Sequence, residues 1–491
     1  MRYPVFLFAL LITSLLIGNN VSVSNTRVLI DGPSASQAVI KFDLNWENSW
    51  RLPTTSAPGN YDAVWVFAKY RFSGQEWQHA TLAAPTKLPA GAIIDIYDQV
   101  GAMIYRSAEG SGDNNFSGVE LIWDRSSGTF NPGDAIEVKV FGIEMVYVPE
   151  DHFYVGDGTD NFNEFYEGGT ALTPFQIASE GEITVGNTVG SLYYSNGSSG
   201  PGDRLGPIPA TFPKGFAAFY CMKYELSQAQ YVDFFNTLPT TVRSNFDPTR
   251  STSGNLGKGT DGEKDHNGCS YTGGDLSTTL PNIPMNYINQ VQSLAYLDWA
   301  GLRPITELEF EKVGRGPGFP VADDYAWGTT ASSVTSTFEY ANFGAANERI
   351  TNLPVSTGNM INDLSPRTDA NGPHRCGIVA ASATNRTRAE TGGSYYGVME
   401  LSGNLWERIV TVGSPAGRNY VGNHGNGQLA TDGTANVSGW PAGTAVAFGI
   451  RAGAYVSADE RCTISSRRNA TADRNRADHD YQGFRGIRTA Q

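Results

Sequence analysis

The fold is decided by the C-terminal stretch GIRAGAYVSADERCTISSRRNATADRNRADHDYQGFRGIRTAQ, which runs from Gly449 to Gln491. Apolar residues near its two ends, such as Ile450 and Phe484, flank a long polar segment that is rich in arginine and contains one cysteine, Cys462. This pattern indicates two strands joined by an irregular polar loop. We expect the loop to take part in whatever the protein contacts. Whether it also carries chemistry depends on the motifs in the rest of the chain.

Length and composition indicate more than one domain and exclude some partners. The chain has 491 residues, which is too many for a single hydrophobic core. Only 17% of the residues are charged, and the net charge is −14. Nucleic acids and anionic membrane surfaces are therefore not expected as partners.

The N-terminal residues have the pattern of a secretory signal peptide. Arg2 precedes an apolar run from Phe6 to Ile17 that is too short to span a bilayer. We assign residues 1–22 to a signal peptide, with a buried N-terminal strand as the alternative. No later stretch reaches transmembrane length, so we expect a secreted, extracellular or cell-surface protein without a transmembrane segment.

Cysteines and histidines are too scattered to define a metal centre by their spacing. The six histidines show no HExxH or HxxxH pattern, which excludes a histidine-rich metal centre on one helix. The four cysteines form no CxxC pair, and in an oxidising compartment they permit disulfides in any of the three possible pairings. They are Cys221, Cys269, Cys376 and Cys462.

Residues 23–142 alternate apolar and polar positions, as half-buried strands do. From Ile40 to Trp46 every second residue is apolar, and turn-forming clusters separate several such segments. We predict a β-sandwich of the immunoglobulin or fibronectin type. We interpret its tryptophans as core residues and not as a carbohydrate platform, because aromatic residues in small sandwiches are mostly buried. They are Trp46, Trp50, Trp65 and Trp77.

Residues 143–491 combine short helices with long irregular loops. Capping boxes at Ser227–Gln230 and Thr306–Glu309 predict two helices, and a further helix is predicted from about Asn289 to Gly301. The chain then becomes rich in Gly and Asn, with few regular signals before the C-terminal stretch. Such loops persist in compact domains where ions, disulfides or function hold them. We therefore predict a mixed α+β, loop-rich domain.

Six motifs follow one another in this region. They are MVYVP with FYVG (Met145–Gly156), YELSQAQY (Tyr224–Tyr231), RPITELEFE (Arg303–Glu311), YAWG (Tyr325–Gly328), GVMELSGNLWER (Gly397–Arg408), and RAGAY with GFR (Arg451–Tyr455 and Gly483–Arg485). In this order they resemble the motifs of the formylglycine-generating enzyme family, also called the sulfatase-modifying factor domain. The resemblance implies a C-type-lectin-like fold for residues 143–491, and residues 23–142 lie outside it.

Structural calcium is the cofactor that the resemblance implies. The first site would use the side chains of Glu400 and Glu407 with the carbonyls of Gly403 and Leu405, a ligand mix that suits a hard cation. The alternative for these two glutamates is that they are solvated or paired loop carboxylates.

A second calcium site is implied nearer the middle of the region. By resemblance it would use Asn342 and the carbonyl of Phe343, with partners near Asn371.

Catalysis in this family requires copper held by two thiolates, because soft sulfur ligands select Cu(I). By resemblance the family's serine falls on Ala454, its first cysteine on Ser457 and its second on Cys462. A single thiolate cannot form the two-sulfur site, so we expect neither copper nor formylglycine synthesis. Cys462, the only candidate catalytic residue, is expected to be a disulfide partner or a buried thiol.

The remaining expectation is a non-catalytic protein whose polar loop presents a recognition surface. Its partner would be an extracellular protein or glycan, or further copies of the chain in an oligomer. The expected surface residues are Tyr395, Tyr420, Trp440, Arg467, Asn469, Arg474 and Asn475. The bland alternative is that the arginines neutralise neighbouring acids.

Two other functions remain open. One is a copper- or iron-dependent oxygenase with rearranged ligands, for which Cys462, His424 and His479 are the available components. The other is a subunit of an extracellular filament, in which the sandwich serves as the assembly module.

Overall fold

The computed structural model describes residues 20–29, 32–34, 36–126, 135–197, 199–250, 266–363, 372–471 and 479–491. The expected signal peptide falls outside this part of the chain except for residues 20–22. The described residues form mostly β structure with few helices. None of the helices in the described ranges is long and apolar enough to cross a membrane.

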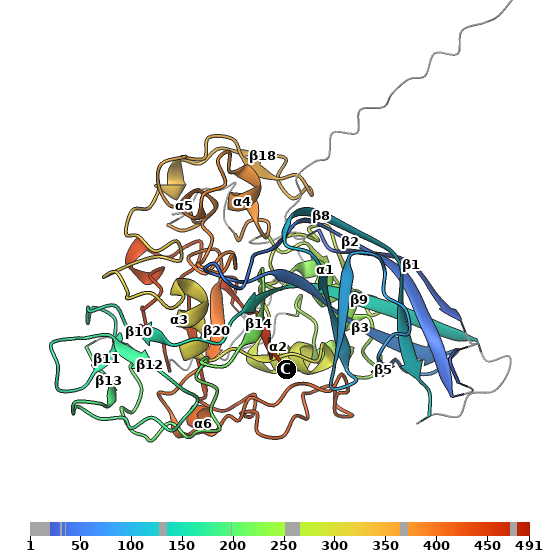
Figure 1. Ribbon diagram of the computed structural model, residues 1–491, viewed down its shortest axis with the longest axis horizontal. Helices are drawn as coiled ribbons and strands as arrows, with labels where there is room; N and C mark the ends of the chain where they lie inside the picture. Colours follow the sequence, from blue (N-terminus) through green and yellow to red (C-terminus); the bar gives the residue numbers. More distant parts are fainter. Residues whose placement is uncertain are drawn as a thin grey trace, which may run out of the picture.

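Two antiparallel sheets make up the N-terminal part of the molecule (Figure 1). Their inner faces share one hydrophobic cluster, in which Ile40 and Phe42 of one sheet meet Val64 and Val66 of the other. The first sheet has the order β1 (Ser22–Leu29), β2 (Gln37–Arg51), β8 (Gly110–Asp124) and β5 (Thr81–Ala83). The second has the order β17 (Arg303–Pro304), β23 (Gly486–Thr489), β14 (Phe219–Met222), β9 (Ile136–Val148), β3 (Asp62–Phe72), β7 (Gly101–Arg106) and β6 (Ala92–Tyr97), with β4 (Gln78–His79) paired to β3.

The predicted period-two alternation is present in β2, because successive side chains of a strand point to opposite faces of its sheet. Trp46 and Trp65 are fully buried, as expected for core residues. Trp50 and Trp77 are only half-buried. Trp50 lies at the end of β2 that faces the six-motif region.

Strand β9 crosses the boundary that the sequence places between residues 142 and 143. It pairs with β3 from Ile136 to Val146 and with β14 from Met145 to Val148. The second sheet therefore continues without interruption from the N-terminal part into the region of the six motifs. The two parts share backbone hydrogen bonds as well as side-chain contacts.

Helices α1 (Gln228–Phe235) and α2 (Gln290–Trp299) cover the opposite face of this shared sheet. The Trp299 ring lies 4.9 Å from Phe141 and 5.0 Å from Phe67, measured between ring centroids. The capping boxes predicted at Ser227 for α1 and at Thr306 for α3 (Glu307–Arg315) are both confirmed. The helices thus bring the six-motif region against the N-terminal sheet.

The rest of the six-motif region consists of short elements joined by loops. Its helices are α4 (Ile378–Ser382), α5 (Arg388–Thr391) and α6 (Pro415–Arg418), with 3-10 turns at Arg243–Asn245, Thr335–Thr337 and Asp459–Arg461. Two-stranded pairs are β10 (Phe153–Val155) with β12 (Phe175–Ile177), β11 (Phe165–Glu167) with β13 (Leu192–Tyr194), β15 (Cys269–Ser270) with β16 (Ser277–Thr278), and β18 (Tyr340–Ala341) with β19 (Arg349–Ile350).

The C-terminal stretch forms the two strands that its sequence predicts. β21 (Phe448–Arg451) and β22 (Gln482–Gly483) lie on either side of β20 (Trp406–Val410), and the polar segment connects them. β21 runs antiparallel to β20, and β22 runs parallel to it.

Candidate functional site

The polar loop holds Cys462 as a buried thiol. Its side chain is not exposed, and the Sγ atom lies 3.8 Å from the carbonyl oxygen of Ala458. Burial raises the pKa of the thiol well above its usual range, and Asp459 adds to this shift. At neutral pH Cys462 is therefore a protonated thiol, whereas nucleophiles and metal ligands are thiolates.

Ser457 and Ala454, which precede Cys462 in the polar loop, are hydrogen-bonded to each other. Ser457 is buried, and its hydroxyl oxygen accepts a hydrogen bond of 2.9 Å from the backbone N–H of Ala454. All four cysteines lie in the described residues, and each is a buried thiol, so the disulfides that the sequence permits are not formed.

The two histidines proposed for a rearranged metal site, His424 and His479, contact other residues of the protein. Nε2 of His424 accepts a hydrogen bond of 3.0 Å from the backbone N–H of Thr489, and burial lowers the pKa of His424 to about 2. The ring of His479 stacks on Tyr481 at 4.8 Å. The described part of the chain contains no group of three or more His, Cys, Asp or Glu side chains that could hold a metal ion.

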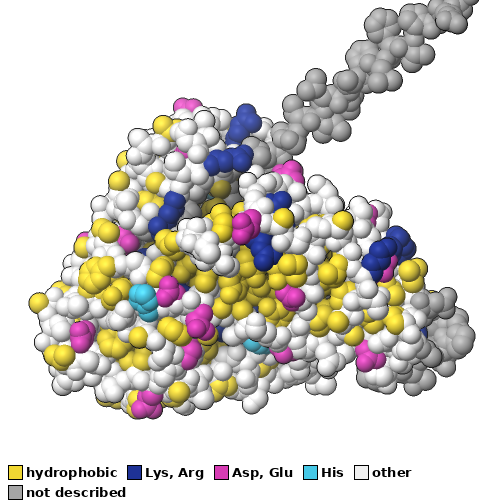
Figure 2. All heavy atoms as spheres, viewed as in Figure 1, with side chains coloured by type: hydrophobic (Ala, Val, Ile, Leu, Met, Phe, Trp, Pro, Cys, Tyr) yellow, Lys and Arg dark blue, Asp and Glu magenta, His cyan; other side chains and the backbone are white. Residues whose placement is uncertain are grey.

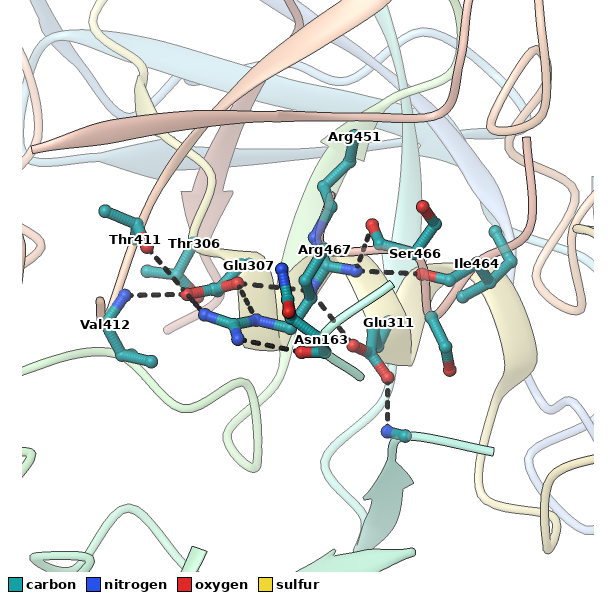
Figure 3. Close-up of polar contacts among 12 residues, drawn as sticks. Asn163, Thr306, Glu307, Glu311, Thr411, Val412, Arg451, Ile464, Ser466 and Arg467 are labelled. Carbon is teal, nitrogen blue, oxygen red and sulfur yellow. Dashed lines mark hydrogen bonds and ion pairs between the residues drawn. The ribbon is translucent and has the colours of Figure 1, made fainter. Parts of the chain in front are cut away.

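Arg467, which is expected at the surface, is buried in an ion-pair network together with Arg451 (Figure 3). Arg467 donates to Glu307 of α3 at 2.8 Å, and Arg451 donates to Glu307 at 3.2 Å and to Glu311 at 3.0 Å. The side chains of Arg451, Arg467, Glu307 and Glu311 are all fully buried. Arg467 therefore does not contribute to a recognition surface, because it is buried and its charge is paired with the carboxylate of Glu307.

Other residues of the expected surface also lie inside the molecule. Tyr420 is fully buried and donates its hydroxyl to the carbonyl of Pro304 at 3.0 Å. Asn469 is buried next to β21. Trp440 is half-buried, and its indole N–H donates to the carbonyl of Asn423 at 2.7 Å. The prediction of a surface at these positions is wrong for Tyr420 and Asn469, because both pack into the core.

Arg474 and Asn475 lie outside the described residues, as does Asn371 of the second expected calcium site. Tyr395 is half-buried and accessible, so it remains available for binding.

The two glutamates expected to bind calcium have different surroundings. Oε1 of Glu400 accepts a hydrogen bond of 2.8 Å from the N–H of Gly377, while Oε2 is buried without a hydrogen-bond partner among the described residues. Burial raises the pKa of Glu400 to about 7. Glu407 instead binds Arg485 through both oxygens, at 2.6 and 2.5 Å. A buried oxygen without a hydrogen-bond partner is suited to bind a cation, so Glu400 remains a candidate calcium ligand. Glu407 is instead a carboxylate paired with Arg485, which is the alternative that the sequence left open.

A buried acid from another segment, Glu225, binds the turn between these glutamates, and the sequence analysis does not single it out. The carboxylate of Glu225 accepts from the N–H of Leu405 at 2.9 Å and from the side-chain amide of Asn404 at 2.6 Å. Gly403 lies in the same turn with φ of +89°, and a Cβ there would meet the carbonyl oxygen of Ile361 at 2.5 Å. Glu225 belongs to the YELSQAQY motif and lies two residues before Ser227, the N-cap of α1.

Of the second expected calcium site, Asn342 and Phe343 lie in the described residues. The ring of Phe343 packs on His266 at 4.4 Å, and Asn342 has φ of +60°. Glu348, which follows Phe343 by five residues, is hydrogen-bonded to Nδ1 of His374 at 2.8 Å.

A cavity of about 410 Å³ lies between the end of β2 and the α4–α5 region. Figure 2 shows the surface hollowed between this region and the N-terminal strands. We call it the interdomain cavity. Its N-terminal wall contains Asn20, Glu47, Asn48, Trp50, Leu52, Pro58 and Asn60. Its other wall contains Lys223, Tyr224, Gly377, Ala380, Ala381, Arg386, Arg388, Thr391, Gly393, Ser394, Tyr395, Tyr396, Gly397 and Met399.

Buried polar contacts fix the two walls of the interdomain cavity relative to each other. The side-chain amide of Asn60 donates to the carbonyl of Tyr396 at 2.7 Å and accepts from the indole N–H of Trp50 at 3.3 Å. Nζ of Lys223 lies 4.9 Å from the centroid of the Trp50 ring and pairs with Glu144 of β9 at 2.6 Å. The cavity is therefore preformed.

The sequence contained only two hints of this cavity, the tryptophan-rich N-terminal part and the accessible aromatic Tyr395. No local pattern could reveal it, because its walls come from segments more than 300 residues apart, as the Asn60–Tyr396 bond shows.

Comparison with known protein families confirms the family resemblance that the six motifs indicate. A family described as "Sulfatase-modifying factor enzyme 1-like domain" matches residues 143–490. This range contains all six motifs and excludes most of the two N-terminal sheets. No curated protein matches the chain.

Proposed function

Because the chain belongs to the sulfatase-modifying factor family, whose domain spans residues 143–490, we propose that it is a non-catalytic member that acts outside the cell or on its surface. The observation that carries the proposal is the state of the polar loop. By resemblance to the family motif, Ser457 stands at the position of one family cysteine, and Cys462 is a buried thiol whose pKa is raised by burial. A copper site built from two thiolates cannot form from these residues as they are placed.

The interdomain cavity is the proposed ligand site. Ligand pockets are typically concave, mostly apolar and preformed, with a few polar groups that orient the ligand. The aromatic side chains of Trp50 and Tyr395 and the nearby charges of Glu47 and Arg386 match this description. The ligand would be an extracellular glycan or protein segment.

Two finer points of architecture belong to the proposal. The N-terminal part would be a β-sandwich domain, which is supported by two facing antiparallel sheets with one shared cluster. Residues 143–491 would adopt the C-type-lectin-like variant of their family, which agrees with their short elements and long loops.

Structural calcium is also part of the proposal, with Glu400 as its anchor. Domains of this family often bind calcium. The buried, unpartnered Oε2 of Glu400 is an oxygen ligand that a cation would satisfy.

Metal analysis together with an activity assay tests the proposal. Purified protein is analysed for copper, iron and calcium, and it is incubated with a cysteine-containing peptide that is then examined by mass spectrometry for formylglycine. We expect calcium without copper or iron, and no product. Stoichiometric copper or iron, or formation of the aldehyde, would overturn the proposal. Export is tested separately by N-terminal sequencing of protein recovered from the medium, which should begin near residue 23.

Self-association is a second candidate, favoured by strand β1. This strand lies at the edge of its sheet and is exposed along most of its length, and such an edge can pair with another chain. Light scattering and electron microscopy of the purified protein would detect oligomers or filaments. A monomer at all accessible concentrations would remove this candidate.

A further inference from the structure

We propose that the interdomain cavity binds an acidic saccharide, with the carboxylate of a uronic-acid unit against Arg386 and the sugar ring against Trp50 and Tyr395. This inference rests on the proposed function, because it names the ligand class of the same site.

Charge is the first argument for an acidic ligand. The chain as a whole carries a net charge of −14, yet the cavity is lined by Lys223, Arg386 and Arg388 against a single acid, Glu47. Figure 2 shows Lys and Arg side chains gathered on the α4–α5 side of the hollow. The cavity is therefore a basic recess on an acidic protein, which favours an anion.

The two arginines of the cavity wall have no carboxylate in ion-pair contact among the described residues. Lys223 pairs with Glu144, but neither Arg386 nor Arg388 forms an ion pair within the described residues. The guanidinium of Arg388 donates to the carbonyls of Gly314 and Ala326, and burial lowers its pKa to about 10. A bound carboxylate would supply the missing negative charge.

Arg386 is placed for direct contact with a ligand. It is exposed, and its Nη1 donates across the mouth of the cavity to Oδ1 of Asn48 at 3.2 Å. Both residues have left-handed backbones, with φ of +53° for Arg386 and +55° for Asn48. Asn adopts this conformation readily, but in Arg386 it costs free energy, and such strained residues cluster at functional sites. The remaining donors of the Arg386 guanidinium are available for a carboxylate.

The other groups favour a hydroxylated ring over a purely apolar acid. Glu47 lines the cavity, and its Oε2 is buried without a hydrogen-bond partner among the described residues, so a sugar hydroxyl that donates to it would satisfy this oxygen. The aromatic rings of Trp50 and Tyr395 offer flat apolar surfaces against which a sugar ring can pack. The volume of about 410 Å³ lies in the range of small-ligand sites.

Binding is tested with the full-length protein and three probes: glucuronate, glucose and benzoate. Titration is followed by calorimetry and by tryptophan fluorescence, since Trp50 lies in the cavity wall. We expect glucuronate to bind at least about tenfold more tightly than glucose or benzoate, because only glucuronate has both a carboxylate and hydroxyls. Its affinity should fall as salt is added, while that of glucose should not.

Variants locate the site. Arg386→Gln should weaken glucuronate binding about tenfold or more, to the level of glucose, and leave glucose binding unchanged. Glu47→Gln should weaken the binding of both sugars. Arg27→Gln is the matched control, since Arg27 is an exposed arginine of β1 that does not line the cavity, and it should bind like the wild type.

Three results would overturn the assignment: no binding of glucuronate at millimolar concentration, equal affinity for glucuronate and glucose, or unchanged binding by Arg386→Gln. Each of these leaves the non-catalytic function intact. Stoichiometric copper or iron would instead overturn the proposed function, whatever the sugars do.

Discussion

Glu400 shows how much a single buried carboxylate can depend on its surroundings. It is 8% exposed, one of its oxygens has no hydrogen-bond partner in the described residues, and burial raises its pKa from 4.5 to about 7. Without a cation, the folded protein therefore holds a proton on Glu400 that the unfolded chain has already released above pH 4.5. This carboxyl should make folding less favourable as the pH rises through 7.

The first prediction concerns Glu400→Gln in the presence of a chelator. Because the folded pKa is the higher one, the wild type should lose stability between pH 5 and 8, whereas the variant, which has no proton to lose, should not. At pH 8 we expect the variant to be more stable than the wild type by about 2–3 kcal/mol. Urea unfolding at the two pH values measures the difference.

Added calcium should reverse this order. Calcium bound at Glu400 should raise the Tm of the wild type and have little effect on the variant, since binding to the folded state adds to stability. A wild-type melting curve that is the same in excess chelator and in calcium would contradict the calcium proposal.

At the scale of elements, α3 explains two of the arginines in the C-terminal stretch, Arg451 and Arg467. This helix is buried on all sides, and three of its acids are held by arginines: Glu307 by Arg467 and Arg451, Glu311 by Arg451 and Arg315, and Glu309 by Arg303. Arg451 and Arg467 therefore hold the C-terminal stretch against α3, and the alternative in which arginines neutralise nearby acids applies to these two residues.

The second prediction concerns Arg467→Ala. The substitution leaves Glu307 buried with only Arg451 as its cationic partner, and removing one member of a buried ion pair costs about 3–5 kcal/mol. We expect a loss near the lower end of that range in urea unfolding. Arg468→Ala is the control: Arg468 is half-buried and forms no ion pair within the described residues, so its loss should cost less than about 1 kcal/mol.

The ion pair between Glu307 and Arg467 also predicts how the stability of the protein depends on pH in the acid range. Burial alone would raise the pKa of Glu307, but Arg467 and Arg451 hold it below the ordinary value of 4.5. Stability from this carboxylate is therefore complete above pH 4.5 and is lost as the pH falls through the lower folded pKa. Arg467→Ala should show a smaller acid-induced loss than the wild type. An equal loss in both proteins would argue against the role given to Glu307.

At the scale of the whole molecule, the N-terminal part and the family domain share one sheet and one hydrophobic cluster. They share strand β9, and the hydrophobic cluster under α1 and α2 contains Trp65 and Phe67 from one part and Phe234 and Trp299 from the other. The indole N–H of Trp65 also donates to the carbonyl of Ala300 at 2.7 Å.

The third prediction is that the full chain unfolds in a single calorimetric transition, whose calorimetric and van 't Hoff enthalpies agree. A truncated chain of residues 143–491 should not fold, because it would expose β9 along its β3 side and uncover the aromatic residues of α1 and α2. Near-UV circular dichroism of the truncated chain checks this. Two separate transitions, or a folded truncated chain, would contradict it.

The sequence by itself determined the local features and the family. Period-two alternation placed β2, capping boxes placed the starts of α1 and α3, and six ordered motifs identified the domain at 143–490, since all of these are patterns of neighbouring residues. Only the tertiary structure decided which charges are internal and where a ligand can enter. The pairing of Arg467 with Glu307, the pairing of Arg485 with Glu407 and the walls of the interdomain cavity all join segments far apart in the chain. An arginine that clamps a helix and an arginine that faces a ligand look alike in sequence, because they differ only in their distant partners.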